Sequence, residues 1–139
     1  MVEYAYIKHE GGVTYIRDTS NAWTSLTNVL RGADSYAITT TIASSATPTP
    51  ERASQKTLYI ITALATNPTF GAPTGTPQEG DALLIWITDN GTSRTISYNA
   101  IYTDGTVTRP TSTTTSTRLV IMFIYDGTNW RCDYAGEDA

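Results

Sequence analysis

Aspartate recurs beside glycine and threonine in three short stretches, TDNGTSRT (88–95), YTDGT (102–106) and YDGT (125–128). Such carboxylates could bind a metal ion or share the acid and base roles of a hydrolase. A calcium site needs about six to eight oxygen ligands, usually from several neighbouring carboxylates, and each stretch supplies one. Aspartate before glycine is also typical of turns, where it accepts hydrogen bonds from the nearby backbone. We therefore expect turns at Asp81, Asp89, Asp104 and Asp126, while paired carboxylates for glycoside hydrolysis stay open.

The other residues that could do chemistry are isolated in the sequence. His9 is the only histidine and stands beside Glu10 without a nucleophile nearby, so we expect a surface or packed side chain. Cys132 is the only cysteine, which excludes an intrachain disulfide and a cysteine zinc cluster; we expect a small buried hydrophobe. The glycine-rich stretch 71–80 lacks the P-loop pattern. The sequence therefore predicts no enzyme activity, no metal and no cofactor.

The charge pattern disfavours two classes of partner. The 139 residues carry a net charge of -4, and Lys8 and Lys56 are the only lysines. Because no basic stripe could neutralise phosphates, we expect neither nucleic acid nor a membrane surface as a partner. The start, MVEYAYIKHE, lacks the layout of a signal peptide, and the longest apolar run, Leu119–Tyr125, is far shorter than the ~20 residues of a membrane span. We expect a soluble protein made in a cytoplasm, with the sequon at 90–92 unglycosylated.

The elements that position these residues should be strands. Threonine, at 27 residues, and nine tyrosines favour pleated structure. Trp23, Leu26 and Leu30 have helical spacing before Gly32, which predicts one short helix. Turn signals roughly every dozen residues favour an antiparallel β-sandwich or barrel, opened by a hairpin with a Gly-Gly turn. The predicted strands are 3–9, 13–18, 36–43, 56–64, 69–70, 81–88, 94–99, 118–125 and 129–134.

Two of these strands, 81–88 and 118–125, are apolar on both faces, and 56–64 is so to a lesser degree. One face of an antiparallel sheet usually meets the core and the other meets water. A second apolar face needs a cover, because monomers rarely expose large apolar patches. The chain's own arm could supply it, but we favour another subunit. Which face is core stays open at this point; the candidate interface residues are Leu84, Trp86, Val120, Met122 and Ile124.

The block 36–134 resembles β-domains of structural proteins from tailed bacteriophages: tail fibres, baseplate-associated proteins, head fibres and capsid decoration proteins. The resemblance is carried by the turn GAPTGTP (71–77), the Gly80-Asp81 strand start, the DNGT turn followed by Arg94-Thr95, and the late IYDGTNW. It implies a jelly-roll-like β-sandwich, a homotrimer, location in the virion and an N-terminal segment that attaches to the particle. It covers about 100 residues and consists of turn and strand signatures rather than catalytic ones.

Together these observations predict an N-terminal attachment hairpin or arm (1–35), a β-sandwich domain (36–134) and a solvated acidic tail (135–139). Heptads or repeats for a fibre shaft are absent from the sequence, so we favour a trimeric capsid decoration (cement) protein. The alternative is a receptor- or glycan-binding module of a tail fibre or baseplate, because Trp23, Trp86 and Trp130 could stack on sugars. The expected partner is a phage capsid or tail protein. Candidate attachment residues are Tyr4, Tyr6, Ile7, Tyr15 and Trp23.

Overall fold

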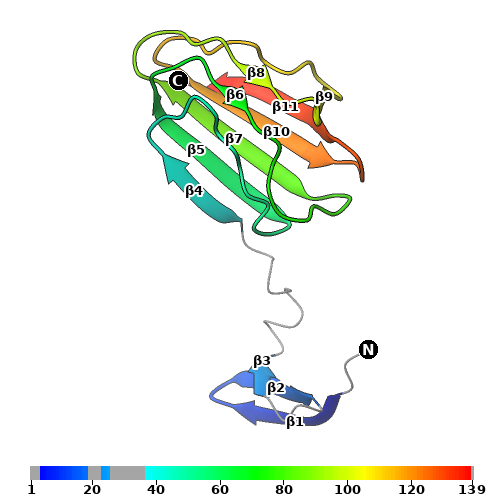
Figure 1. Ribbon diagram of the computed structural model, residues 1–139. Helices are drawn as coiled ribbons and strands as arrows, with labels where there is room; N and C mark the ends of the chain where they lie inside the picture. Colours follow the sequence, from blue (N-terminus) through cyan, green and yellow to red (C-terminus); the bar gives the residue numbers. More distant parts are fainter. Residues whose placement is uncertain (1–3, 19–22, 26–36, 139) are drawn as a thin grey trace. The chain divides into compact units, whose positions relative to one another are not determined.

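The computed structural model describes residues 4–18, 23–25 and 37–138 and divides the chain into two compact units, Met1–Ser35 and Tyr36–Ala139 (Figure 1). All regular elements within these described ranges are β-strands, as the threonine-rich composition predicted. Because the described residues include no helix, they contain none with the length and apolarity of a membrane crossing.

The first unit is an antiparallel sheet in the order β1 (Tyr4–Glu10), β2 (Val13–Asp18) and β3 (Trp23–Ser25). The predicted hairpin is confirmed, and its turn uses Gly11 and Gly12 with φ of 56° and 76°. The predicted helix is wrong at its first residues, because Trp23–Ser25 pairs with β2. Backbone pairing along β2 outweighs a weak helical spacing in a threonine-rich segment. The rest of the expected helix, with Leu26, Leu30 and Gly32, lies outside the described residues.

The second unit is built on one six-stranded sheet. Its order is β4 (Ile38–Ile42), β5 (Lys56–Leu64), β7 (Ala82–Asp89), β10 (Arg118–Tyr125), β11 (Trp130–Asp138) and β9 (Tyr102–Asp104). The long strands β5 and β10 have the predicted bounds, because their unbroken apolar and β-branched runs leave little choice of element.

The expected antiparallel arrangement is corrected to a mixed sheet. β7, β10 and β11 pair antiparallel, whereas β4 with β5, β5 with β7, and β9 with β11 pair parallel. A parallel pair requires a crossover of about a dozen residues or more. The Pro- and Gly-rich segment 65–81 provides it between β5 and β7, because it crosses the sheet instead of forming a hairpin.

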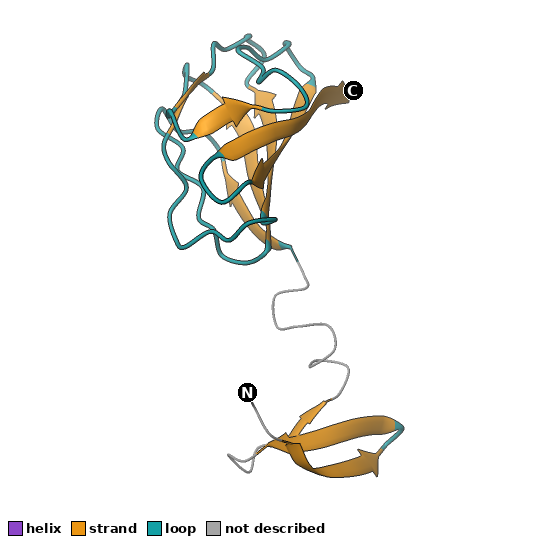
Figure 2. Ribbon diagram, turned by 90° about the vertical axis from the view of Figure 1, so that its right-hand side faces the viewer, coloured by secondary structure: helices purple, strands orange, loops and turns teal. Residues whose placement is uncertain are grey.

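A thinner second layer covers one face of this sheet, which makes the unit sandwich-like (Figure 2). It contains the parallel pair of short strands β6 (Thr69–Phe70) and β8 (Ser97–Tyr98). Backbone hydrogen bonds tie the layer together laterally: Gly71 N to Pro48 O (2.9 Å), Asn99 N to Phe70 O (2.8 Å) and Ile96 N to Thr111 O (2.8 Å). The segments 46–52, 69–74, 94–99 and 111–113 therefore lie side by side.

The core lies between the two layers. Alternate residues of the long strands point inward, and the second layer contributes aromatic rings to meet them. From the second layer, Tyr98 packs edge-on against Phe123 of β10 with ring centroids 6.0 Å apart and stacks on Phe70 at 5.7 Å. Tyr102 of β9 also tilts against Phe123, at 4.9 Å. The fully buried large side chains include Trp130, Tyr102, Phe70, Phe123, Ile61, Leu64, Leu83, Ile85, Ile87 and Ile121.

Two boundaries differ from the sequence prediction. The segment 135–139, expected to be a solvated tail, continues β11 as far as Asp138, which pairs with Arg118 of β10. Pairing with β10 orders this end although Glu137 and Asp138 are exposed. The strand expected at 94–99 shortens to β8 and lies in the second layer. The DNGT turn therefore moves the chain between layers and does not close a hairpin with β7.

Candidate functional site

The most distinctive surface of the second unit is the face of its six-stranded sheet that the second layer does not cover. Leu84 lies in register with Leu58 of β5 and Met122 of β10, and Met122 in turn with Tyr134 of β11. The next row joins Ile60, Trp86 and Val120 in the same way. We call the following residues the outer face: Leu58, Ile60, Leu84, Trp86, Val120, Met122, Ile124 and Tyr134.

The five predicted interface residues all lie on this outer face. β7 alternates strictly between half-buried and buried positions, so Leu84 and Trp86 are half-buried while Leu83, Ile85 and Ile87 lie in the core. β10 alternates in the same sense over most of its length. The structure thus decides which apolar face is core, a choice that the sequence left open.

Two β-bulges determine which side chains of the neighbouring strands β5 and β11 lie on the outer face. Alternation alone would put Leu64 with Leu58 and Ile60, but a register shift after Ile61 turns Leu64 into the core, where it is fully buried. A second shift in β10–β11 separates Cys132, which is buried, from Tyr134, which is 51% exposed. A bulge adds a residue to one strand and so breaks the period of two. Sequence reasoning therefore missed Tyr134.

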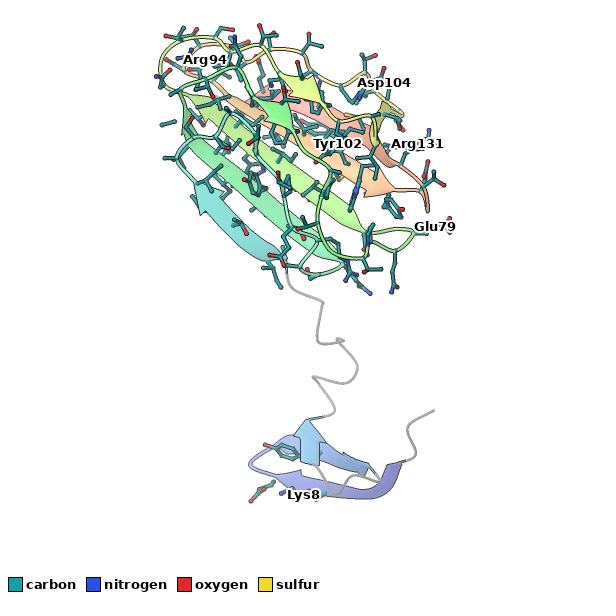
Figure 3. All side chains as sticks on the ribbon, in the orientation of Figure 1. Lys8, Glu79, Arg94, Tyr102, Asp104 and Arg131 are labelled. Atoms are coloured by element: carbon teal, nitrogen blue, oxygen red, sulfur yellow. The ribbon has the colours of Figure 1, made fainter. Side chains whose placement is uncertain are left out.

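Polar groups border the apolar residues. The Arg118 guanidinium lies 4.5 Å from the ring centroid of Trp86 and forms an ion pair with Asp138. This pair lowers the pKa of the Asp138 carboxyl, chiefly through its hydrogen bond from Arg118. Lys56 and Arg131 are exposed near the opposite end of the same strands; Figure 3 labels Arg131. An apolar centre with aromatic and Met side chains inside a polar border is typical of a protein–protein interface.

The predicted attachment residues lie in the first unit. Tyr4, Tyr6 and Ile7 are in β1, Tyr15 is in β2 and Trp23 begins β3. In the backbone register, Arg17 of β2 lies opposite Tyr6 of β1 on one side and opposite Trp23 of β3 on the other. The next pair of the β1–β2 ladder is Ile7 with Ile16. The ammonium of Lys8 lies 5.1 Å from the ring centroid of Tyr15.

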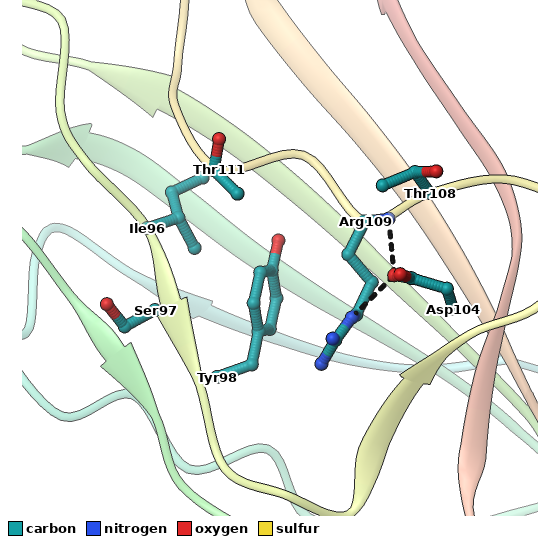
Figure 4. Close-up of a pocket in the computed structure, with 7 residues that line it drawn as sticks. All are labelled: Ile96, Ser97, Tyr98, Asp104, Thr108, Arg109 and Thr111. Carbon is teal, nitrogen blue, oxygen red and sulfur yellow. Dashed lines mark hydrogen bonds and ion pairs between the residues drawn. The ribbon is translucent and has the colours of Figure 1, made fainter.

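A polar pocket of ≈ 320 Å³ lies on the other side of the second unit, where β8 meets the loop after β9 (Figure 4). Asp104 Oδ1 accepts hydrogen bonds from Arg109 N (3.0 Å) and Arg109 Nε (2.8 Å). Arg109 also donates to Tyr102 O, and its guanidinium lies 5.5 Å from the ring centroid of Tyr98. The lining residues are Ile96, Ser97, Tyr98, Asp104, Thr108, Arg109 and Thr111.

The electrostatics of this pocket are set by the Asp104–Arg109 pair. The hydrogen bonds from the Arg109 backbone and side chain hold the pKa of Asp104 below its ordinary value, so this carboxyl is ionised at neutral pH. Burial raises the pKa of the Tyr98 phenol, which donates to Pro110 O at 2.8 Å. Sequence reasoning assigned Asp104 to a turn and did not find this pocket, because Tyr98 and Arg109 reach it from separate segments.

The remaining residues that the sequence offered for chemistry, Cys132 and His9, both lie in β-strands. Cys132 is buried, and burial first, then the nearby Asp104 charge, raises the pKa of its thiol to about 11. His9 occupies a position in β1 opposite Thr14. No group of three or more His, Cys, Asp or Glu residues that could hold a metal ion occurs within the described ranges.

Comparisons with known proteins do not assign this chain to a family. Neither a family model nor a curated protein matches the chain. One similar solved structure bears the description "Structure of a chaperone-substrate complex", with 16% sequence identity and a TM-score of 0.42 over 91% of this chain and 21% of that one. This chain thus spans about a fifth of that neighbour's length. Similarity at this level carries no argument about function.

Proposed function

We propose that this protein is a non-enzymatic structural protein of a bacteriophage virion, and specifically a capsid decoration protein that forms a homotrimer and binds the capsid surface. The resemblance of block 36–134 to phage β-domains supports the virion assignment, the trimer and a jelly-roll relationship. The observation that carries assembly is the outer face: the sheet is apolar on both sides, and the described residues of the second unit cover only one of them.

The size of the outer face suits a self-interface that uses its polar border as well. Strand spacings of ~4.8 Å and rises of ~3.4 Å per residue give an apolar area on the order of 400 Å². A stable interface buries about 800 Å² per partner, so the apolar centre supplies roughly half. Thr88 and the Arg118–Asp138 pair, beside the apolar rows, would contribute to the remainder.

The proposed mechanism needs no chemistry. A trimer presents its attachment segment in several copies, and simultaneous binding of neighbouring capsid subunits raises avidity without new contacts. Binding to the assembled shell but not to its separated subunits stabilises the shell by mass action. The first unit, with Tyr4, Tyr6, Ile7, Tyr15 and Trp23, is the proposed attachment segment.

The test combines molar mass with capsid binding. We expect a trimer by multi-angle light scattering and co-sedimentation with expanded capsids. Trp86→Ser should yield a folded monomer that binds capsids weakly. Ile38→Ser is the matched control, because Ile38 is a large apolar residue, 44% exposed, on edge strand β4, where it lies in register with the buried Thr57 rather than on the outer face. A monomeric wild-type protein without capsid affinity would refute the proposal.

The alternative function is a receptor- or glycan-binding module of a tail fibre or baseplate, and the polar pocket beside Tyr98 is the observation that favours it. Immunogold labelling of virions separates the two functions. Label on the head supports decoration, whereas label on the tail supports the alternative.

A further inference from the structure

The Asp104–Arg109 pair presents an acceptor and a donor side by side in the pocket beside Tyr98 (Figure 4). Oδ1 of Asp104 is occupied by two bonds from Arg109. Within the part of the chain that the structure describes, Asp104 Oδ2 accepts no hydrogen bond and Arg109 Nη2 donates none. The free acceptor is accessible, because the Asp104 side chain is 52% exposed.

We infer that this pocket binds a single neutral hexopyranose unit through two adjacent hydroxyl groups. One hydroxyl donates to Asp104 Oδ2 while its neighbour accepts from Arg109 Nη2. Because the pair is neutral overall, it favours neither an anion, which Asp104 repels, nor a cation, which Arg109 repels. A vicinal diol matches a neighbouring carboxylate and guanidinium without any net charge.

The rest of the lining fits the same ligand. Ser97, Thr108 and Thr111 bring hydroxyls, and the buried Ile96 adds an apolar contact to the lining. At ≈ 320 Å³ the pocket is at the lower end of ligand sites, which run from about 300 to 1,000 Å³. Its size therefore suits one ring, such as the terminal unit of a surface glycan.

The polar groups are also held in place before a ligand arrives. Arg109 is fixed by Asp104, by Tyr102 O and by its position over the Tyr98 ring. Tyr98 is fixed in turn by its bond to Pro110 O. Groups that are already ordered lose little conformational entropy on binding. The pocket lies between the second layer and the edge strand β9, whereas the outer face is the opposite side of the six-stranded sheet, so sugar binding and assembly are separable.

The test is a titration of the isotope-labelled full chain, followed by amide chemical shifts, with methyl α-D-glucopyranoside, methyl α-D-mannopyranoside and methyl β-D-galactopyranoside. We expect at least one probe to bind in the millimolar range and to shift amides in 96–98 and 104–111. Asp104→Asn retains the Oδ1 acceptor for Arg109 but replaces Oδ2 with an amide donor, so affinity should fall about tenfold or more. Thr108→Trp, at an exposed loop position, should block the pocket.

Matched controls make each outcome decisive. Glu79→Gln removes an exposed carboxylate elsewhere and should bind like wild type, as should Trp86→Ser, which tests assembly alone. No shift with any probe, shifts outside the pocket, or undiminished binding by Asp104→Asn and Thr108→Trp would each overturn the inference. Tighter binding of acetate than of the neutral sugars would overturn the diol argument. None of these results bears on the trimer or on capsid binding.

Discussion

At the scale of single residues, the carboxylates of Asp81, Asp89 and Asp126 accept hydrogen bonds from backbone N–H groups at turns. Asp126 Oδ1 accepts from Thr128 N (2.9 Å) and Asn129 N (2.7 Å) and closes the hairpin between β10 and β11. Gly127 in this turn has φ of 93°, a conformation that glycine adopts without a Cβ penalty. Asp81 accepts from Gln78 N and pairs with Arg52, which ties the segment before β5 to the start of β7. The Asp-Gly-Thr recurrence thus marks chain turns.

Asp89 is the strongest of these anchors and should dominate the acid sensitivity of the second unit. Its buried carboxylate accepts from Gly91 N (3.0 Å), Thr113 Oγ1 (2.9 Å) and Ser116 N (3.2 Å). Burial acts to raise its pKa, but the hydrogen bonds from Ser116, Thr113 and Gly91, together with the positive charge of Arg94, outweigh burial, so the pKa lies below the ordinary value. This contribution to stability is complete above about pH 4 and is lost as the pH falls through the lowered folded-state pKa.

We therefore expect Asp89→Asn to lower the free energy of unfolding by about 1–3 kcal/mol at pH 7, because the amide cannot accept all three bonds. The deficit should shrink as the pH falls from about 4 through the lowered folded-state pKa of Asp89, because the wild-type carboxyl then becomes protonated and loses acceptor capacity. Urea unfolding at several pH values measures both effects, with Glu79→Gln as control. Equal stability of the variant and the wild type at pH 7 would contradict this role.

Cys132 should be chemically inert in the folded protein. Its thiol is buried, and its pKa is raised to about 11, so little thiolate exists near neutral pH. We expect slow reaction with a disulfide reagent at pH 8 in the native state and fast reaction after denaturation. Rapid stoichiometric labelling of the native protein would show that the thiol is accessible.

At the scale of elements, each of the strands β7 and β10 contributes side chains to two different surfaces. Their inward residues build the core, and their outward residues build the outer face. Alternation along each strand was readable from the sequence, because successive side chains point to opposite faces. The bulges near Leu64 and Tyr134 could not be predicted from the sequence, because each depends on how the neighbouring strand pairs.

Two adjacent substitutions in β7 separate these roles. Ile85→Ala empties a fully buried site and should cost about 2–5 kcal/mol in the free energy of unfolding. Leu84→Ala acts at a half-buried position and should cost less than about 1.5 kcal/mol while weakening self-association. Denaturant unfolding and light scattering on both variants measure this. Similar stability losses, with no change in association for Leu84→Ala, would argue against the outer face as an interface.

At the scale of the whole molecule, the chain consists of two units that each have their own sheet. The described core of the second unit is formed wholly by its own residues, from Tyr59 to Cys132. A chain of residues 37–139 should therefore fold with nearly unchanged unfolding temperature. It should retain the trimer and lose capsid binding, as measured by light scattering and co-sedimentation. A truncated chain that still binds capsids would move the attachment site away from the first unit.

The sequence by itself determined an all-β protein, the bounds of its strongest strands, the hairpins at Gly11 and Gly127, and the presence of two apolar faces. These follow from local propensity and from a period of two. The tertiary structure alone decided that the sheet is mixed, that Leu84 and Trp86 face outward, and that Tyr98 meets Arg109. Strand direction, bulges and pockets depend on which distant segments pair, and pairing is fixed by the packing of the whole unit rather than by any one stretch.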